Sequence, residues 1–357
     1  MAQAGTSDRN ETPEATYSAM PKFGDSNYAA VILAGGDGLR LSSFTREIYG
    51  HHIPKQFCPL FQGETLLERT QRRVSLLIPA AQTIAVLNQE HEQFYSPLLG
   101  ATPSTNLVIQ PKNRGTAPAI LYALRHLIED GHTGPVAIFP SDHQVSDDSK
   151  FMLQVAAALS AVELSPWLTL LLGITPDEPA SDYGWIEPGA SVAPAHPVLG
   201  QISRIRGFWE KPSPGIARDL YHRGCLWNSF VLVANARTLL SLIARALPAV
   251  YREFIQIRSF LGIAADEEIV RTIYRELPSV DFSAGLVAKF PTEFAVSRVT
   301  GISWSDLGDP KRLLAAISSG DGRSIFGGNQ NVPRSQTLEI PARQERTSWH
   351  KAFQGRR

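Results

Sequence analysis

The first strongly apolar run of the sequence, Tyr28–Leu33, stops abruptly at the glycine-rich stretch Ala34–Gly38. A short apolar run bounded by glycines is typical of a buried strand. Glycines at the end of a strand let backbone N–H groups approach an anion closely, because no Cβ holds the ligand away and positive φ is allowed. Two cations follow, Arg40 and Lys55. The stretch therefore predicts a phosphate-binding loop at the carboxyl edge of an α/β sheet, where ligands bind.

Two common phosphate-binding loops do not match this stretch. A P-loop requires a Gly-Lys pair followed by Ser or Thr, and residues 34–57 contain no Gly-Lys pair. The dinucleotide fingerprint requires an acidic residue after the second strand, whereas the next apolar strand, Thr83–Leu87, ends at Asn88. A plain tight turn remains the alternative for the glycines considered alone.

Apolar strand-like runs and helical segments alternate from residue 28 to residue 174, and shorter strands follow between prolines. Such alternation predicts an α/β fold with a doubly wound, mostly parallel sheet of Rossmann-like type and helices on both faces. The expected strands are Tyr28–Leu33, Thr83–Leu87, Asn106–Gln110, Val136–Phe139, Leu168–Ile174, Tyr183–Pro188, Gln201–Trp209, Leu226–Ala234, Val280–Ala288 and Phe294–Ser303. The expected helices are Thr65–Leu77, one between Leu87 and Asn106, Thr116–Asp130, Lys150–Leu164, Ala236–Ala246, Val250–Phe260 and Pro310–Ile317.

Composition divides the chain and excludes several classes of function. Residues 1–24 lack periodicity and predict a disordered lead-in, residues 25–319 predict the folded domain, and residues 320–357 predict a flexible basic tail. The 34 basic side chains balance the 34 acidic ones, so neither nucleic acid nor a membrane surface is an expected partner. Only two cysteines, Cys58 and Cys225, occur, which favours a reducing cytoplasm over a disulfide framework.

The residues AGGDGLRL at 34–41, followed by PKQF at 54–57, resemble the signature of the nucleoside-diphosphate-sugar pyrophosphorylases. The PKQF form is similar to that of the mannose-1-phosphate guanylyltransferases in particular. The resemblance runs from Val31 to Gly308 through at least six motifs in the order of the family. One departure is that the family more often has Trp-Pro after Arg-Leu, whereas this chain has Ser42-Ser43.

The resemblance implies a nucleotide half at about 25–175. There the glycine loop wraps a triphosphate, and Arg40, Lys55 and Asp142 form the catalytic group. The loop that starts at Gln110 would contact the base, although the family usually has Glu and Asn at positions 110 and 115. Glutamine at position 110 resembles pyrophosphorylases that read uracil or thymine. The nucleotide-binding residues implied are Leu33, Ala34, Gly35, Gly36, Gly38, Gln110, Gly115 and Thr116.

The resemblance also implies a sugar-phosphate half at about 176–319, with Gly184 and Glu210 on sugar hydroxyls and Lys211 on the phosphate. Residues 227–230 resemble the motif W-N-S-G-x-F but lack its glycine after serine, and Asn228 is implied to bind a sugar hydroxyl. Asp142 and Asp306, the latter in a W-x-D-x-G element, would hold Mg²⁺ as cofactor. Two carboxylates plus phosphate oxygens are a common magnesium environment.

Together these motifs imply a nucleotidyltransferase that joins GTP and mannose 1-phosphate into GDP-mannose, with pyrophosphate as leaving group. Two alternatives stay open: a related enzyme that uses UTP, dTTP or ATP, and a regulatory module that binds a nucleotide sugar without turnover. We expect only small-molecule substrates as partners. The sequence leaves open whether the chain forms a homodimer.

Overall fold

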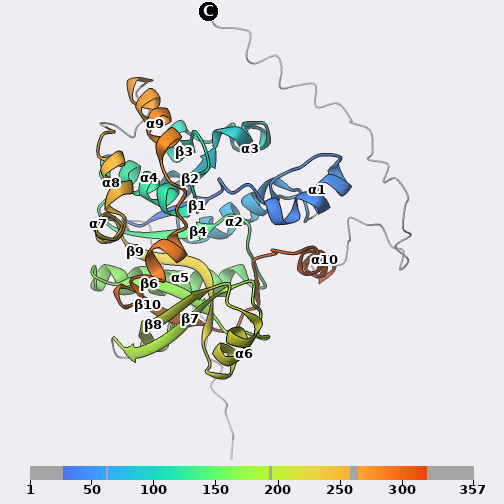
Figure 1. Cartoon of the computed structure of the whole chain (residues 1–357), viewed down its shortest axis with the longest axis vertical. Helices are drawn as coiled ribbons and strands as arrows, with labels where there is room; N and C mark the ends of the chain where they lie inside the picture. The colour runs from blue at the N-terminus through green and yellow to red at the C-terminus, as the bar shows by residue number, and fades with distance from the viewer. Residues whose placement is uncertain (1–26, 62, 193–194, 258–263, 320–357) are drawn as a thin grey trace, which may run out of the picture.

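The computed structural model describes residues 27–61, 63–192, 195–257 and 264–319 (Figure 1). The predicted lead-in at 1–24 and the predicted tail at 320–357 lie outside the described residues. Among the described residues, no helix is both long and apolar enough to cross a bilayer.

One nine-stranded sheet runs through both halves of the chain, in the order β3-β2-β1-β4-β9-β6-β10-β8-β7. Its first four strands are parallel to one another, as predicted for the nucleotide half. The strands of this sheet are β1 (Ala29–Leu33), β2 (Thr83–Asn88), β3 (Leu107–Gln110), β4 (Pro135–Pro140), β6 (Thr169–Ile174), β7 (Gly184–Ser191), β8 (Ile202–Glu210), β9 (Leu226–Asn235) and β10 (Ala295–Val299).

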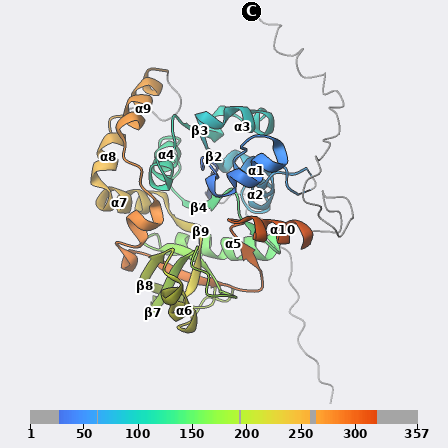
Figure 2. The same ribbon diagram turned by 45° about the vertical axis from the view of Figure 1, so that its right-hand side comes forward.

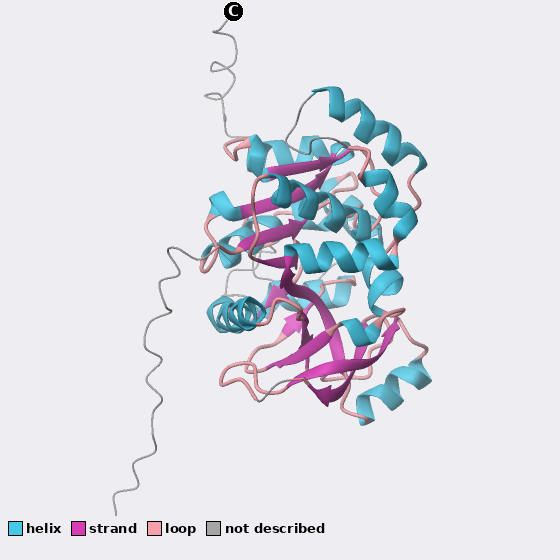
Figure 3. Ribbon diagram, turned by 90° about the vertical axis from the view of Figure 1, so that its left-hand side faces the viewer, coloured by secondary structure: helices cyan, strands magenta, loops and turns pink. Residues whose placement is uncertain are grey.

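The strands after residue 175 join this parallel part largely by antiparallel pairing. Strand β9 lies antiparallel between β4 and β6, and β10 lies between β6 and β8. A separate two-stranded sheet pairs β5 (Gln144–Val145) with β11 (Trp304–Ser305). Figure 3 shows that the strands form a continuous twisted layer from one end of the molecule to the other.

Helices cover both faces of the sheet, so the predicted α/β class is confirmed. Side chains of β1 alternate between the faces: Ala30 and Ile32 pack in one apolar cluster, Ala29 and Val31 in the other. In Figure 2, α4, α7, α8 and α9 lie on one side of β1–β4, and α1, α2 and α3 on the other. The helices are α1 (Ser42–Tyr49), α2 (Leu66–Ser75), α3 (Glu92–Leu99), α4 (Thr116–Glu129), α5 (Asp148–Leu164), α6 (Pro214–His222), α7 (Ala236–Ala246), α8 (Pro248–Phe254), α9 (Ala264–Glu276) and α10 (Pro310–Ser319).

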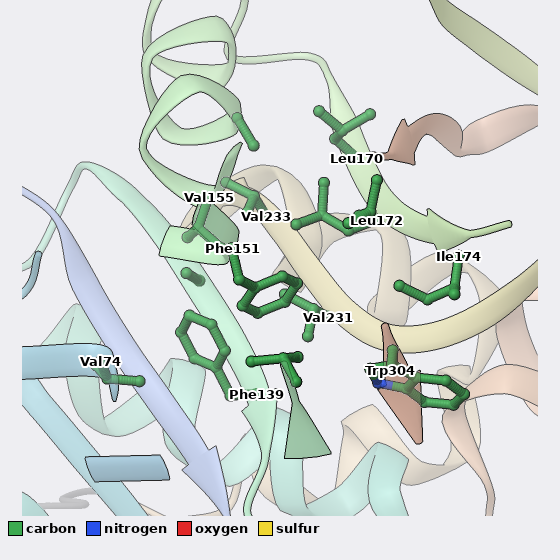
Figure 4. Packing of buried hydrophobic residues seen from close by; sticks show 14 of the residues in the cluster. Val74, Phe139, Phe151, Val155, Leu170, Leu172, Ile174, Val231, Val233 and Trp304 are labelled. Carbon is green, nitrogen blue, oxygen red and sulfur yellow. The ribbon is translucent and has the colours of Figure 1, made fainter. Parts of the chain in front are cut away.

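The core behind the site is packed between α5 and the middle of the sheet. Phe139 of β4 and Phe151 of α5 pack there in one apolar cluster with Leu172 and Val231 (Figure 4). All four side chains are at most 3% exposed. Their burial fixes the carboxyl end of β4, after which Asp142 follows.

The prediction of a strand at Val280–Ala288 was wrong, because residues Ser283–Val287 form a π-helical turn. The Asp281 carboxylate accepts a hydrogen bond from the N–H of Ala284 at 2.8 Å, which caps this turn. Aspartate side chains compete with strand pairing in this way. The sequence analysis also missed three helices, namely α1, α6 and α9.

Candidate active site

The buried side-chain amide of Gln56 holds the glycine loop after β1. The Nε2 atom of Gln56 donates hydrogen bonds to the carbonyls of Ala34 and Gly36, at 2.9 and 2.6 Å. Gln56 is 2% exposed, so both bonds are shielded from water. Two loop carbonyls are thereby directed inward. The glutamine of PKQF, which the sequence analysis left without a role, therefore positions the loop.

Gly36 and Gly38 play different parts in this loop. Gly38 has φ +63°, and a Cβ at this position would lie 2.8 Å from the backbone nitrogen of Lys55. A Cβ at Gly36 would meet no heavy atom within 4 Å. Gly38 thus lets the chain turn against Lys55, whereas Gly36 leaves space open for a ligand.

We expect Gly38→Ala to lower the free energy of unfolding by about 2 kcal/mol, because strain and a close contact add. Gly36→Ala is the matched control: its stability should stay within about 0.5 kcal/mol of the parent, while its methyl group should weaken nucleotide binding. Thermal unfolding and nucleotide titration of both variants measure the two effects. Equal stability of the two variants would contradict this division.

Lys55 is buried and paired on several sides. Its ammonium nitrogen lies 3.0 Å from a carboxylate oxygen of Asp142 and also donates to the backbone carbonyls of Asp306 and Leu307. The side chain is 5% exposed. The sequence analysis placed Lys55 in the catalytic group, and its ammonium has three acceptors within the protein. Lys55 therefore also ties the end of β4 to the loop after β11, 251 residues away.

Asp142 and Asp306 lie on either side of Lys55, since pairing of β5 with β11 aligns the segments that carry them. Asp142 is 30% exposed at its side chain, whereas Asp306 is 9% exposed. Both oxygens of Asp306 accept hydrogen bonds, one from Arg40 at 2.9 Å and the other from the N–H of Gly308 at 2.8 Å. The structure thus links both predicted aspartates to Lys55, Asp142 through its carboxylate and Asp306 through its backbone carbonyl, and pairs the Asp306 carboxylate with Arg40.

Charges around Asp142 keep its carboxyl ionised. Burial acts to raise its pKa, but the nearby Lys55 ammonium, with smaller contributions from His143 and Arg40, holds the pKa below its ordinary value. Burial lowers the pKa of His143 to about 4, although Asp142 opposes this shift. At neutral pH the site therefore presents a carboxylate next to an uncharged imidazole.

On the base side, the Gln110 side chain is buried against the glycine loop. Its Oε1 accepts a hydrogen bond from the Tyr274 hydroxyl at 3.2 Å, and a Cβ at Gly35 would lie 2.9 Å from its Nε2. Gly35 therefore leaves room for Gln110. Tyr274 lies on α9, which no sequence signal identified, so its role was missed.

The loop residues Gly115 and Thr116 contact the segment around Asp281. Gly115 has φ +84°, and a Cβ there would collide with the carbonyl of Val280. The Thr116 hydroxyl donates to the Asp281 carboxylate at 3.0 Å and accepts from the N–H of Phe282 at 2.7 Å. Gly115 thus has a packing role. The asparagine that is usual in the family would fit here only if the backbone at Val280 moved away.

In the predicted sugar-phosphate region, Glu210 ends strand β8 opposite Gly184 of β7, and Lys211 follows directly after it. A Cβ at Gly184 would lie 3.0 Å from Oε2 of Glu210, so the glycine leaves space for this carboxylate. Burial and the Asp281 carboxylate raise the pKa of Glu210, and Lys211 opposes the shift. The Lys211 ammonium lies 3.7 Å from the Glu210 carboxylate and its side chain is 58% exposed. It is therefore accessible to an anionic ligand.

Three residues other than glycine adopt positive φ within the described part of the chain, and all of them lie around this site: Lys211 at 46°, Phe230 at 61° and Leu307 at 48°. Each costs on the order of 1 to 3 kcal/mol. Such strain persists only where the surrounding structure enforces it. Lys211, for example, is held by its N–H, which donates to the Tyr183 carbonyl at 3.2 Å.

Two cavities of small-molecule size meet at this site. The nucleotide-side cavity, of about 320 Å³, is lined by Gly38, Lys55 and Gly308 among others. The second cavity, of about 270 Å³, is lined by Glu210 and Lys211, and we call it the sugar-side cavity after their predicted role. The predicted nucleotide-binding residues Leu33, Gly36 and Thr116 also line it. Arg40 and Asp142 line both. A ligand in one cavity would therefore lie next to a ligand in the other.

Most of the predicted site residues line one of these cavities. They are Leu33, Gly36, Gly38, Arg40, Lys55, Thr116, Asp142, Gly184, Glu210, Lys211 and Asn228. The remaining predicted residues are not among those that line either cavity: Ala34, Gly35, Gln110, Gly115 and Asp306. Lining residues to which the sequence analysis gave no role in the site include Asp37, Gln56, Asp182, Tyr183, Phe230 and Ser283.

Comparison with known proteins gives a family and several relatives. A family model described as nucleotidyl transferase matches residues 29–320. The xanthan biosynthesis protein XanB of Xanthomonas campestris pv. campestris (strain B100) is 31% identical over 307 residues, which cover 84% of this chain and 61% of XanB. A mannose-1-phosphate guanylyltransferase of Escherichia coli is 28% identical over 319 residues, covering 87% of this chain and 64% of the relative. The chain thus spans less than two thirds of these relatives.

Among solved structures, one described as a mannose-1-phosphate geranyltransferase from Thermus thermophilus superposes with a TM-score of 0.68. It is 27% identical in sequence, and the match covers 81% of this chain and 80% of that one.

Proposed function

Because this chain belongs to the nucleotidyl transferase family, we propose that it joins GTP and mannose 1-phosphate to give GDP-mannose and pyrophosphate. The observation that carries this proposal is the shared wall of the two cavities, which Arg40 and Asp142 line together. A transfer between two anionic substrates needs their reacting atoms side by side. The relatives named as mannose-1-phosphate guanylyltransferases support the choice of substrates.

In the proposed reaction, a phosphate oxygen of mannose 1-phosphate attacks the α-phosphorus of GTP. The bond from the α-phosphorus to the oxygen that bridges to the β-phosphate breaks, and its electron pair leaves with pyrophosphate. No covalent intermediate with the protein is required. Arg40 on the nucleotide side and Lys211 on the sugar side neutralise the phosphates, which otherwise repel each other. Positioning and charge stabilisation supply the acceleration.

We further propose Mg²⁺ as the cofactor, held by Asp142 and Asp306. The donors fit this ion, because carboxylate oxygens are the ligands it prefers. The hydrogen bonds of Asp306 leave acceptor capacity, since each carboxylate oxygen has two lone pairs. Within the described residues, no group of three or more acidic, His or Cys side chains could hold a metal alone. Substrate phosphates would therefore complete the coordination. When bound, Mg²⁺ would offset negative charge on the triphosphate.

We propose guanine as the base because relatives are named guanylyltransferases, and a panel of substrates tests this choice. We expect pyrophosphate release, across GTP, ATP, UTP and dTTP with mannose 1-phosphate and glucose 1-phosphate, to be fastest with GTP and mannose 1-phosphate. A buried site that hydrogen-bonds a base edge leaves polar groups unpaired with the wrong base, so selectivity of at least about 10²-fold is expected. A preference for UTP or dTTP would refute guanine and keep the reaction type.

The same assay separates turnover from binding alone. A regulatory module would bind GDP-mannose in a titration but release no pyrophosphate from any pair of substrates. The Asp142 carboxylate, which lines both cavities, favours the enzyme. A module that only bound an anionic nucleotide sugar would gain from Arg40 and Lys211, but not from a negative charge where the two cavities meet.

A further inference from the structure

Strand β9 contains a bulge at the sugar-side cavity. Leu232 pairs with Leu171 and Asn228 pairs with Gly173, so Ser229, Phe230 and Val231 together face only Leu172 on β6. Phe230 is the middle residue of this bulge and has φ +61°. Bulges next to ligand sites commonly redirect one side chain. The strained residue here is the one whose side chain is redirected.

Hydrogen bonds of the flanking residues hold the strained conformation. Oδ1 of Asn228 accepts from the N–H of Phe230 at 3.0 Å, while its Nδ2 donates to Ser283 Oγ at 3.2 Å. The Ser229 hydroxyl accepts from the N–H of Val231 at 3.1 Å and donates to the Leu172 carbonyl at 2.5 Å. Asn228, predicted to bind a sugar hydroxyl, therefore has its Oδ1 engaged in the bulge and its Nδ2 engaged with Ser283 of the π-helical turn.

The Phe230 side chain is an apolar wall in a polar cavity. It lines the sugar-side cavity together with charged residues such as Glu210, Lys211 and Asp281. Behind it, its ring meets the buried ring of Phe282 edge to face, with centroids 6.1 Å apart. Glycine would adopt φ +61° without strain, and the motif that this stretch resembles has glycine here. Strain at a ligand site is a reason to ask what function it serves.

We propose that Phe230 is a specificity-determining residue for the sugar 1-phosphate. The proposal rests on the proposed function, since it assigns the sugar to this cavity. The ring packs against an apolar C–H face of the pyranose. An epimer that directs a hydroxyl at the ring would lose the hydrogen bonds of that hydroxyl without replacement, and is disfavoured for that reason.

The test compares Phe230→Gly and Phe230→Leu with the parent protein on epimeric substrates. With saturating GTP, kcat/KM is measured for mannose, glucose and galactose 1-phosphates. We expect the ratio between the best epimer and at least one other to fall about 10-fold or more in Phe230→Gly. Phe230→Leu keeps an apolar wall and should keep most of the ratio. Ratios in Phe230→Gly within about twofold of the parent would overturn the proposal and leave Phe230 a packing residue for Phe282.

Two further measurements keep this test independent of the reaction. Equilibrium titration with each sugar 1-phosphate alone gives the ratio of the dissociation constants, which should fall in the same direction in Phe230→Gly. If the protein released no pyrophosphate, the proposed function would be refuted and this binding ratio would still test the role of Phe230. The melting temperature of Phe230→Gly should exceed that of Phe230→Ala by about 2 °C or more, because glycine relieves the strain. Equal melting temperatures would show that the backbone at Phe230 is not strained. The argument that the strain is retained for the function of the ring would then be lost.

Discussion

Replacing Asp142 with asparagine is expected to lower turnover by at least about 10²-fold. The substitution removes the negative charge that lines both cavities, and with it a proposed ligand of Mg²⁺. Loss of one preorganised charged group at a reacting centre typically costs this much. Asp306→Asn should behave similarly. Turnover is measured by pyrophosphate release, and metal affinity by titration with Mn²⁺.

Two controls accompany this experiment: the free energy of unfolding of the variant, and a matched substitution outside the site. In Asp142→Asn the new amide oxygen can still accept a hydrogen bond from Lys55, so we expect a loss of only about 1 to 2 kcal/mol in the free energy of unfolding. Asp147→Asn is the matched control, because Asp147 caps α5 through a bond to the N–H of Lys150 and asparagine caps helices equally well. Full activity in Asp142→Asn would refute its catalytic assignment.

The second large effect is expected at the two lysines of the site: replacing Lys55 should mainly lower the stability of the fold, and replacing Lys211 should mainly impair use of the sugar phosphate. Lys55→Ala removes a buried ammonium and leaves the Asp142 carboxylate without its partner at 3.0 Å. Breaking a buried ion pair from one side costs about 3 to 5 kcal/mol. Lys211→Ala removes an exposed charge, so stability should change by at most about 0.5 kcal/mol. Its kcat/KM for the sugar phosphate should instead fall about 10- to 100-fold, the usual loss for one charged hydrogen bond.

Denaturant unfolding and separate KM values for the two substrates distinguish these outcomes. Lys150→Ala, which removes another lysine whose side chain is 59% exposed, controls for the loss of surface charge. Local action of Lys211 is expected because charges are screened over roughly 8 Å at physiological salt. The opposite result would be that Lys55→Ala and Lys211→Ala give the same stability and the same loss of kcat/KM toward both substrates. In that case, the assignment of Lys55 to the fold and of Lys211 to the sugar phosphate would be wrong.

Local sequence signals predicted the nucleotide half well, because its strands are continuous apolar runs and its loops contain recognisable motifs. Strand β1 and the turn at Gly38 follow from adjacent residues alone. Gln110 was also placed correctly at the end of its strand. Its partner Tyr274 could not be found, since it lies 164 residues away on a helix that the sequence analysis missed.

The sugar half was predicted less completely, because its arrangement depends on pairing between distant strands. No local pattern indicates that β9 inserts between β4 and β6, or that Lys55 binds the carbonyl of Asp306. The conformation of Phe230 had one signal, the glycine missing from its motif. That absence indicated a departure from the family, but only the backbone angle shows that phenylalanine takes up the conformation that glycine would have adopted.

The late position of β10 in the sequence has a consequence for synthesis on the ribosome. This strand, Ala295–Val299, lies between β6 and β8, so both remain without it until roughly 90 residues after β8 have been made. At about 5 to 20 residues per second, that interval lasts on the order of 5 to 20 seconds. Unpaired strand edges are templates for aggregation. The parallel strands β1–β4 can associate much earlier, so we expect the nascent chain to be most prone to aggregation while β6 and β8 still lack β10.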